Sequence, residues 1–394
     1  MKLSSRLARV VPSQTLAMKQ AADEQTARGH SVIDFGPGEP DLDTPAHVVA
    51  AAKTALDTGQ THYTASAGLP VLRAALAASL GQRAGVSLDP SSIMVTCGGK
   101  SGILYVMLAL LEDGAEAVIP SPCWVSFPEQ VKLAGGEPVL VPFPAREGFE
   151  PRLDDIAAAV TAHTRLIVIN SPANPTGAVV DPAFWQELAT LARERDLVVL
   201  SDETYLDFVY DGAVATSALT AMSLFAENLV VVGSFSKAYA MTGWRVGYTW
   251  AGSTLAKALR TLQSQDTTHP ATFAQLGALA ALEGPQEPLQ AMVAAYARRR
   301  RLILSEMEKV PGFACVPPRG AFYVFPDVRG AMERTGCEDD TEFALRALQE
   351  AGVAMVAGSA FACPGHVRLT YAVSEEDIRE GVARLARWVE GGGK

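Results

Sequence analysis

The sequence predicts an α/β protein with a large domain, built on a mainly parallel sheet flanked by helices, and a smaller α+β domain. Short β-branched runs alternate with helical patterns in the middle of the chain, and this alternation indicates a parallel sheet covered on both faces. The C-terminal part lacks the alternation. The chain has 394 residues, which is too long for one small hydrophobic core and indicates two domains.

Five short apolar runs are predicted as buried strands, at residues 93–96, 117–120, 166–170, 197–201 and 229–233. A helix follows the third strand, with Asp181 as its cap, Pro182 in its first turn and an apolar face of Phe184, Leu188 and Leu191. The alanine-rich stretches 154–162 and 274–282 are also predicted as helices.

The C-terminal part also shows helix and strand patterns, but they do not alternate as they do in the middle of the chain. Ser374 and Asp377 form a capping pair before a helix with one apolar face, made of Ile378, Val382, Leu385 and Val389. Strand-like segments at 321–325 and 367–371 flank a further helix near 341–349. Glycine and proline cluster at 284–288. We therefore predict a large domain over residues 46–284 and a small one over 285–394.

Composition excludes several classes of partner. A formal net charge of -10 disfavours nucleic acid and anionic lipid. The five cysteines are odd in number, widely spaced and without a CxxC pair, which argues against a disulfide framework and a structural zinc site. The chain shows no secretory signal and no apolar run that spans a bilayer. We expect a cytoplasmic protein without a metal, a nucleic acid or a membrane partner.

Polar motifs follow all five predicted strands. They read CGGKSG, SPCW, SPANPTG, DETY and SFSKAYAMTGWR, and begin at residues 97, 121, 171, 202 and 234. Ligands of open α/β sheets bind at the carboxyl ends of the strands. These glycines, hydroxyls, charges and aromatic rings suit a ligand that is polar, aromatic and phosphorylated.

The set of motifs resembles the fold-type I pyridoxal-phosphate enzymes, among them the class I aminotransferases and their bacterial aspartate aminotransferase-like subgroup. The matching motifs run from GEPD at 38–41 to GHVRLTYA at 365–372, and SxSKxxxMTGWRxGY at 234–248 is the most specific. The resemblance implies a seven-stranded sheet, pyridoxal 5'-phosphate as cofactor, and transfer of an amino group from an L-amino acid to a 2-oxo acid.

The resemblance also implies which residues carry the chemistry. Lys237 matches the lysine that binds the cofactor aldehyde and moves a proton as base and acid. Asp202 matches the carboxylate that keeps the ring nitrogen protonated. Tyr205 and Asn174 match the pair that contacts the ring oxygen, and Asn174 also contacts substrate.

A second set of residues matches the family's cofactor cradle. Gly99 and Lys100 open a helix whose free N–H groups suit a phosphate. Ser234 supplies a hydroxyl, and Arg245 supplies a guanidinium that binds phosphate through two bonds. Trp124 is expected to stack on the ring.

Tyr63 matches the family tyrosine that reaches the phosphate of the neighbouring subunit, which implies a homodimer with shared active sites. Arg368 matches the arginine that binds the substrate α-carboxylate through two parallel bonds. Gly38 offers a bare backbone N–H to the same carboxylate. We therefore expect residues 1–45 to join the small domain.

Lys100 also bears on substrate choice. In the similar subgroup a lysine at this place binds the distal carboxylate, helped by hydroxyls that match Ser13 and Thr15. This favours aspartate and glutamate as donors, with oxaloacetate and 2-oxoglutarate as oxo acids. If the side chain of Lys100 only adds positive charge near the phosphate, it gives no support for a dicarboxylate substrate. Aromatic or prephenate transamination and C–S lyase activity stay open within the fold.

A different class shares the fold, since a related domain senses effectors in certain transcription regulators. Those proteins carry an N-terminal DNA-binding domain, whereas the motifs here begin at Gly38 and the charge is acidic. The chain departs from the subgroup at Asp266 and His269, where small hydroxyl residues are usual, and at Cys363. Asp266 and His269 either line the substrate entrance or lie on the surface, and the surface is favoured for His269.

Overall fold

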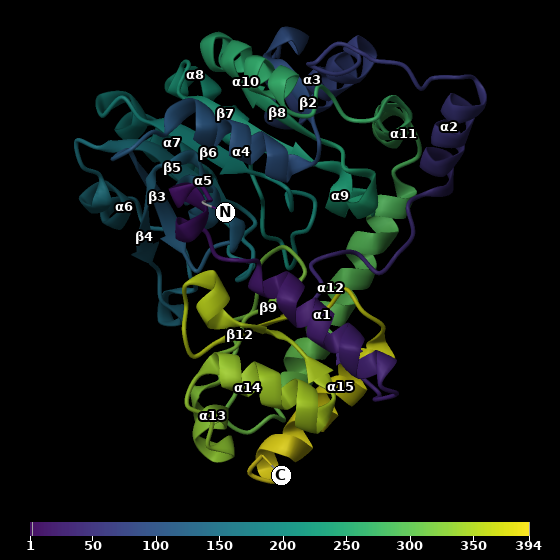
Figure 1. Ribbon diagram of the computed structural model, residues 1–394, viewed down its shortest axis with the longest axis vertical. Coiled ribbons are helices and arrows are strands. Elements are labelled where there is room, and N and C mark those ends of the chain that lie inside the picture. The colour runs from purple at the N-terminus through teal and green to yellow at the C-terminus, as the bar shows by residue number, and fades with distance from the viewer. Residues whose placement is uncertain (2, 394) are drawn as a thin grey trace.

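The computed structural model describes residue 1 and residues 3–393 of the chain. A larger part is built on a seven-stranded sheet, and a smaller part carries the C-terminal helix (Figure 1). The predicted α/β class, with a mainly parallel sheet flanked by helices, is confirmed.

The strands of the large sheet are, in spatial order, β2 (Ile93–Thr96), β8 (Gly247–Ala251), β7 (Leu229–Ser234), β6 (Val198–Asp202), β5 (Thr164–Asn170), β3 (Glu116–Ser121) and β4 (Glu137–Pro142). All neighbours pair in parallel except β8, which is antiparallel to both β2 and β7. The carboxyl ends of the other six strands, and the start of β8, therefore lie at one edge of the sheet.

All five predicted strands are present, and two more were missed. The β4 strand has the sequence EPVLVP and lies at the edge of the sheet, where prolines cost no ladder hydrogen bond. The β8 strand, GYTWA, begins two residues after the SFSKAYAMTGWR motif ends, and its glycine, tyrosine and threonine interrupt any apolar run. Neither strand carries the β-branched pattern that identified the others.

Alternate strand residues enter two different cores. In β7, Val231 packs in one core, while Val230 and Val232 pack in the other. One face is covered by α4 (Gly99–Leu110), α5 (Ser126–Ala134) and α10 (Ser253–Gln265) (Figure 1). The opposite face is covered by α2 (Ala46–Asp57), α3 (Pro70–Ala84), α6 (Leu153–Ala159), α7 (Pro182–Glu194) and α11 (Thr272–Glu283). Both faces of the sheet are therefore buried, as parallel strands require.

Two predicted helix caps had different outcomes. Ser374 caps the C-terminal helix α15 (Glu375–Glu390), because its Oγ accepts from the N–H of Asp377 at 3.0 Å. Asp181 stands at the cap position of α7, but its side chain makes no capping bond and instead accepts from Arg319 Nη2 at 3.3 Å. The capping role predicted for the Asp181 side chain is wrong, since this ion pair draws the carboxylate away.

The smaller part holds two short sheets and a core of its own. One sheet pairs β1 (Ile33–Asp34) with β10 (Val353–Ala354), and the other has the order β11 (Val356–Ala357), β12 (Val367–Thr370), β9 (Tyr323–Val324). Its helices include α1 (Gln14–Ala27), α12 (Glu287–Met307), α13 (Arg329–Thr335), α14 (Asp340–Arg346) and α15. The long helix α12 begins within the predicted boundary and enters this core through Met292 and Ile303 (Figure 1).

The N-terminal segment contacts both parts of the molecule. The short helix η1 (Ser5–Arg9) lies against α5, where Arg9 donates to the carbonyl of Gly136 at 3.0 Å. The next helix, α1, instead contacts β10 and β11 of the smaller part. The segment therefore crosses from one part to the other, and the assignment of residues 1–45 to the small domain stays a prediction.

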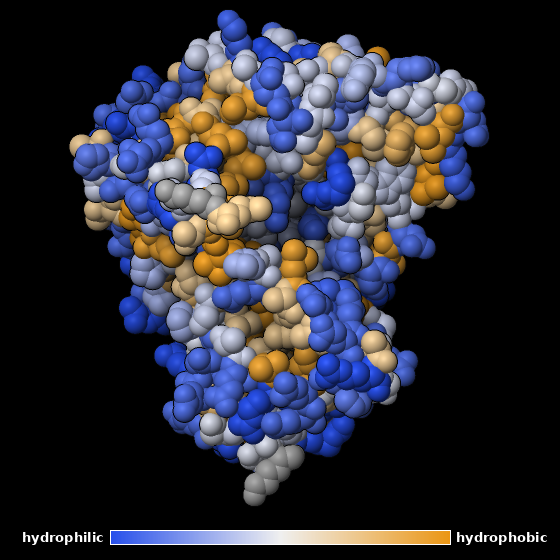
Figure 2. Space-filling view, viewed as in Figure 1, coloured by the Kyte–Doolittle hydropathy of each residue, from blue (hydrophilic) through white to orange (hydrophobic). Residues whose placement is uncertain are grey.

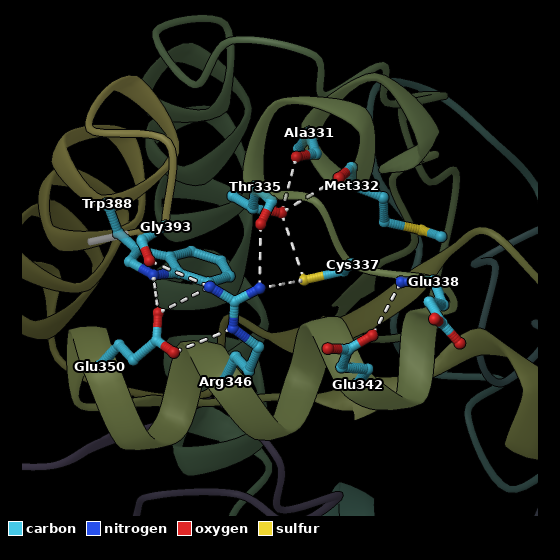
Figure 3. Close-up of polar contacts among 10 residues, drawn as sticks. All are labelled: Ala331, Met332, Thr335, Cys337, Glu338, Glu342, Arg346, Glu350, Trp388 and Gly393. Atoms are coloured by element: carbon cyan, nitrogen blue, oxygen red, sulfur yellow. Dashed lines mark hydrogen bonds and ion pairs between the residues drawn. The ribbon is translucent and has the colours of Figure 1, made fainter.

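Arg346 joins four segments at the far end of the smaller part (Figure 3). Its guanidinium donates to Glu350, to the carbonyl of Thr335 and to the carbonyl of Gly393, at 2.9 to 3.2 Å. Glu350 also accepts from the indole of Trp388 at 2.7 Å. These bonds fasten the C-terminal helix and tail to α14 and to the turn before it.

Three findings bear on partners and cofactors. Within residues 1 and 3–393, no helix has the length and apolarity needed to cross a membrane. In the same residues, no three His, Cys, Asp or Glu side chains come together as a metal site. All five cysteines lie within the described residues, and none of them forms a disulfide there.

We expect Gly247→Ala to destabilise the protein. A Cβ at Gly247 would lie 2.4 Å from the nitrogen of Gly99 and 2.6 Å from the carbonyl carbon of Gly98, both backbone atoms at the start of α4. Overpacking of this kind costs about 1–3 kcal/mol, or several degrees of melting temperature. Calorimetry of the cofactor-free protein measures the shift.

Gly243→Ala is the matched control, because a Cβ at this neighbouring glycine would meet no atom within 4 Å. Its melting temperature should stay within about a degree of wild type. Equal shifts in the two variants would contradict the close packing of β8 against α4.

Candidate active site

A cavity of about 330 Å³ opens between the two parts, at the carboxyl edge of the large sheet. Figure 2 shows this face of the molecule hollowed there, with hydrophilic residues inside. Most residues predicted for the site line the cavity, namely Thr15, Gly38, Gly99, Lys100, Trp124, Asn174, Asp202, Tyr205, Ser234, Lys237, Arg245 and Arg368. Residues that the sequence did not single out also line it, namely Leu16, Ile103, Asn170, Thr204, Ser236 and Tyr323.

Strand register explains why residues far apart in sequence meet here. Asn170, the last residue of β5, pairs with Asp202, the last residue of β6. Ser234, the last residue of β7, pairs with Gly247. Since the sheet aligns these ends, each following loop delivers its polar side chains to the same edge.

Lys237 lies on the one-turn helix α9 (Phe235–Ala238), directly after β7. Its Nζ donates to the carbonyl oxygen of Gly38. Burial lowers the pKa of this amine to about 8, although nearby Glu39 acts in the opposite direction. Lys237 therefore supplies a neutral, nucleophilic amine much more readily than an exposed lysine does.

Asp202 presents a buried carboxylate to the same cavity. It accepts from the N–H of Thr204 at 3.1 Å. Burial raises the pKa of Asp202, while the backbone bond and the ammonium of Lys237 lower it. A buried carboxylate in this situation is stabilised by a cation or an N–H donor held in the cavity.

Two tyrosines form one wall of the cavity. The hydroxyls of Tyr205 and Tyr323 lie 2.8 Å apart, and both side chains are buried. Burial raises the pKa of each phenol, so both stay protonated and able to donate. A Cβ on Gly38 would lie 2.8 Å from the Tyr323 hydroxyl, which explains why glycine occurs there.

Hydrogen-bond donors gather at the start of α4. Gly98 precedes this helix with φ of 75°, and the first turn of α4 leaves backbone N–H groups free. A Cβ on Gly98 would lie 2.6 Å from Nη2 of Arg245, so the guanidinium lies directly against the glycine. Ser234 places its hydroxyl beside them. This combination of a helix start, a guanidinium and a hydroxyl suits a phosphate.

Lys100 and Trp124 lie at the mouth of the cavity. The Nζ of Lys100 is 4.9 Å from the centre of the Trp124 ring, which is a cation–π distance. Although Lys100 is exposed, the surrounding protein and the nearby Arg245 lower the pKa of its ammonium. Lys100 thus adds a positive charge to the cavity besides those of Lys237, Arg245 and the buried Arg368.

Arg368 is only 2% exposed. It donates from Nη1 to Asn174 Oδ1 at 3.1 Å and from Nη2 to the carbonyl of Gly36, while its Nε has no partner. No carboxylate of residues 1 or 3–393 forms an ion pair with it. Burial lowers the pKa of Arg368. A buried guanidinium so placed is a binding site for an anion in the cavity.

Asn170 was not singled out from the sequence, yet it holds this side of the site together. Its Oδ1 accepts from the N–H of Asn174 at 2.8 Å, and its Nδ2 donates to the carbonyl of Asp202 at 3.0 Å. The side chain therefore fixes the NPTG loop onto the end of β6. The sequence could have indicated Asn170, because it is the last residue of a predicted strand and directly precedes the SPANPTG motif.

Two predicted site residues lie outside the cavity. The Ser13 hydroxyl lies 2.9 Å from that of Thr15, and Thr15 alone lines the cavity. Tyr63 is 89% exposed and lies on a loop away from this chain's own cavity. Its predicted role, which is to serve a neighbouring subunit, stays a prediction.

Asp266 and His269 do not line the cavity either. Asp266 accepts from the hydroxyl of Tyr105 at 2.6 Å. His269 is half-buried and bonds through both ring nitrogens to backbone groups. His269 is therefore half-buried and hydrogen-bonded, whereas the sequence favoured a surface position for it.

Comparison with known proteins agrees with this geometry. A family model described as aminotransferase class I and II matches residues 30–385. An aspartate aminotransferase of Geobacillus stearothermophilus is 39% identical over 390 residues, which cover 99% of each chain. A protein of Aquifex aeolicus, named a probable aspartate/prephenate aminotransferase, is 42% identical over 98% of each chain.

The fold is also similar to solved structures. An aspartate aminotransferase of Thermus thermophilus, solved with maleate, has a TM-score of 0.93 at 40% identity. The match covers 98% of this chain and 99% of that one.

We expect Lys237→Met to stabilise the cofactor-free protein at neutral pH. Lysine has an ordinary pKa of 10.5, against about 8 in the folded protein. Below pH 8 the folded and the unfolded protein both carry the proton on Lys237. Burying this charge costs the folded protein about 3 kcal/mol. Methionine removes this cost and keeps the apolar stem.

The advantage should shrink as pH rises from about 8 to 10.5, because the unfolded state alone binds the proton in that window. Urea unfolding of both proteins at several pH values measures the difference, and Lys257→Met, an exposed lysine of α10, is the control. A stability difference that does not change with pH would show that the amine is not perturbed by burial.

Proposed function

The chain belongs to the aminotransferase class I and II family, and on that premise we propose that it transfers the amino group of aspartate or glutamate to a 2-oxo acid. Oxaloacetate and 2-oxoglutarate are the proposed oxo-acid partners. The observation that carries the proposal is a buried Arg368 without a carboxylate, which shares its cavity with the cation of Lys100. Of the four cationic side chains that line the cavity, Lys237 and Arg245 suit the cofactor, and the two that are left, Lys100 and Arg368, suit a dicarboxylate.

The family implies pyridoxal 5'-phosphate as cofactor, and the residues present fit that group. The donors around Gly99, Ser234 and Arg245 suit its phosphate. The buried carboxylate of Asp202 suits a protonated ring nitrogen, and Lys237 suits its aldehyde. When bound, the cofactor supplies that aldehyde and an electron-withdrawing pyridinium ring.

The chain's own residues have distinct proposed tasks. Lys237 Nζ, whose pKa burial lowers to about 8, takes a proton from the substrate Cα and later returns one. Asp202 holds the proton on the ring nitrogen through its buried charge. Tyr205 would donate a hydrogen bond to the ring oxygen, and Trp124 would contact the ring, since both side chains line the cavity.

Arg368 orients the amino acid. Its Nε–H and the remaining Nη hydrogens are available for two parallel bonds to the α-carboxylate, since each Nη has one protein acceptor. Asn174 holds the guanidinium in this orientation. Lys100, aided by Thr15 and Ser13, binds the distal carboxylate.

Prephenate is a second candidate for the oxo-acid acceptor, because it is also a dicarboxylate. Leu16 and Ile103 add apolar surface to the cavity, which a carbon ring could contact. Relatives from Aquifex aeolicus and Cereibacter sphaeroides bear names that include prephenate.

We also propose a homodimer with shared active sites, working in the cytoplasm. The 89% exposure of Tyr63, on a loop away from its own cavity, supports a role in the partner's site. The five free cysteines suit a reducing compartment.

We expect Lys100→Met to discriminate between donors. The change removes the second cation and keeps an unbranched apolar stem. The Michaelis constants for aspartate and glutamate should rise about 10- to 100-fold relative to that for phenylalanine, since a charge-assisted bond contributes ~1.5–3 kcal/mol. Steady-state kinetics with the three donors measures the ratio.

Lys132→Met is the matched control. Lys132 lies on α5, is paired with Glu129, and does not line the cavity. If all three donors weaken equally in Lys100→Met, the lysine serves the cofactor and the dicarboxylate proposal fails.

We expect mixed dimers of Tyr63→Ala and Lys237→Ala to recover activity. Each variant alone has two defective sites, whereas a hybrid has one site with both residues intact. Refolding an equimolar mixture should therefore restore roughly a quarter of wild-type activity. An active monomer in sedimentation would refute the shared site.

A further inference from the structure

One segment of the chain, residues 263–275, holds the loop that carries Tyr63. Four side chains of this segment bond to backbone groups of residues 62–69. These bonds are Thr272 Oγ1 to the His62 carbonyl at 2.7 Å, Gln275 Oε1 to the Leu69 N–H at 2.8 Å, Gln263 Nε2 to the Ser66 carbonyl, and His269 Nε2 to the Thr64 N–H at 3.1 Å.

His269 bonds to the N–H of Thr64, the residue that directly follows Tyr63, and both nitrogens of its ring are engaged. Nδ1 lies 2.7 Å from the carbonyl of Pro270, and a carbonyl only accepts. The hydrogen therefore sits on Nδ1, which leaves Nε2 as the acceptor for the N–H of Thr64. Both nitrogens are used, and the ring is neutral in this arrangement.

The same ring also contacts the Tyr63 side chain. The two ring centres lie 5.7 Å apart at an interplanar angle of 89°, an edge-to-face arrangement. Tyr63 is otherwise 89% exposed. His269 thus limits both the backbone beside Tyr63 and the direction in which the phenol points.

The supporting segment is fixed in turn to helix α4. The hydroxyl of Tyr105 lies 2.6 Å from Asp266 Oδ2 and 3.1 Å from Thr267 Oγ1. Tyr105 is buried on α4, the helix that opens with Gly99 and Lys100. Helix α4, the bonds of Tyr105 and the segment 263–275 therefore connect this chain's own phosphate cradle to the loop that bears Tyr63.

We propose that His269 is a positioning residue that holds the Tyr63 hydroxyl where it donates to the cofactor phosphate in the second copy's cavity. The inference rests on the proposed shared active site. An untethered loop would have to be ordered each time the cofactor binds, which weakens binding through lost conformational entropy. His269 removes that cost in advance.

The test compares His269→Leu, which fills similar space without an acceptor, with His269→Gln, whose amide oxygen reaches the place of Nε2. The measured quantity is the dissociation constant of pyridoxal 5'-phosphate for the dimer, by fluorescence titration. We expect about 3- to 10-fold weaker binding for leucine and a value within about twofold of wild type for glutamine. His163→Leu, an exposed histidine before β5, should change nothing.

A double-mutant cycle with Tyr63→Phe tests whether His269 acts through Tyr63. If it does, His269→Leu weakens cofactor binding by less than about twofold once the Tyr63 hydroxyl is absent. Amide hydrogen exchange of the cofactor-free dimer gives an independent readout, because the Thr64 N–H should exchange faster in the leucine variant. If leucine prevents folding, His269→Ala serves in the same cycle.

The outcomes separate this inference from the proposal on which it rests. If Tyr63→Phe weakens cofactor binding but His269→Leu does not, or if the two losses are additive, His269 does not position Tyr63, and the shared site stands. If Tyr63→Phe binds the cofactor as tightly as wild type, the shared site itself is wrong, and the role of His269 is overturned with it.

Discussion

The site depends on charges that the protein buries without neutralising them. Lys237, Arg368 and Asp202 all face one cavity, and Arg368 has only neutral oxygens as partners. A charge buried in this way costs several kcal/mol unless a ligand compensates it. For the same reason, burial lowers the pKa of Lys237. These buried charges suit the phosphorylated cofactor that the family implies and the carboxylate substrate that we propose.

Both parts of the molecule build the site. The larger part aligns Asn170, Asp202 and Ser234 through strand register, and the smaller part supplies Arg368 from β12. Because Arg368 also bonds to Asn174 of the larger part and to Gly36, its guanidinium joins the two parts beside the cavity. This arrangement suits closure over substrate and exclusion of water.

Much of this arrangement was predictable from the sequence, because buried strands and the motifs after them have distinctive patterns. The strand ends led directly to Lys237 and Asp202. Residues such as Tyr323 and Asn170 were missed because a tyrosine in an apolar run, or an asparagine at a strand end, resembles ordinary core or turn chemistry. The role of His269 depends on a contact with Thr64, about 200 residues away, and no local pattern encodes such a contact.

The most direct test of the proposed site identifies the residue that binds the cofactor. The protein is loaded with pyridoxal 5'-phosphate, reduced with borohydride and digested, and its peptides are mapped by mass spectrometry. We expect one phosphopyridoxyl group, on Lys237, and no such group in Lys237→Ala. A modified Lys100 or another lysine, with Lys237 untouched, would contradict this assignment.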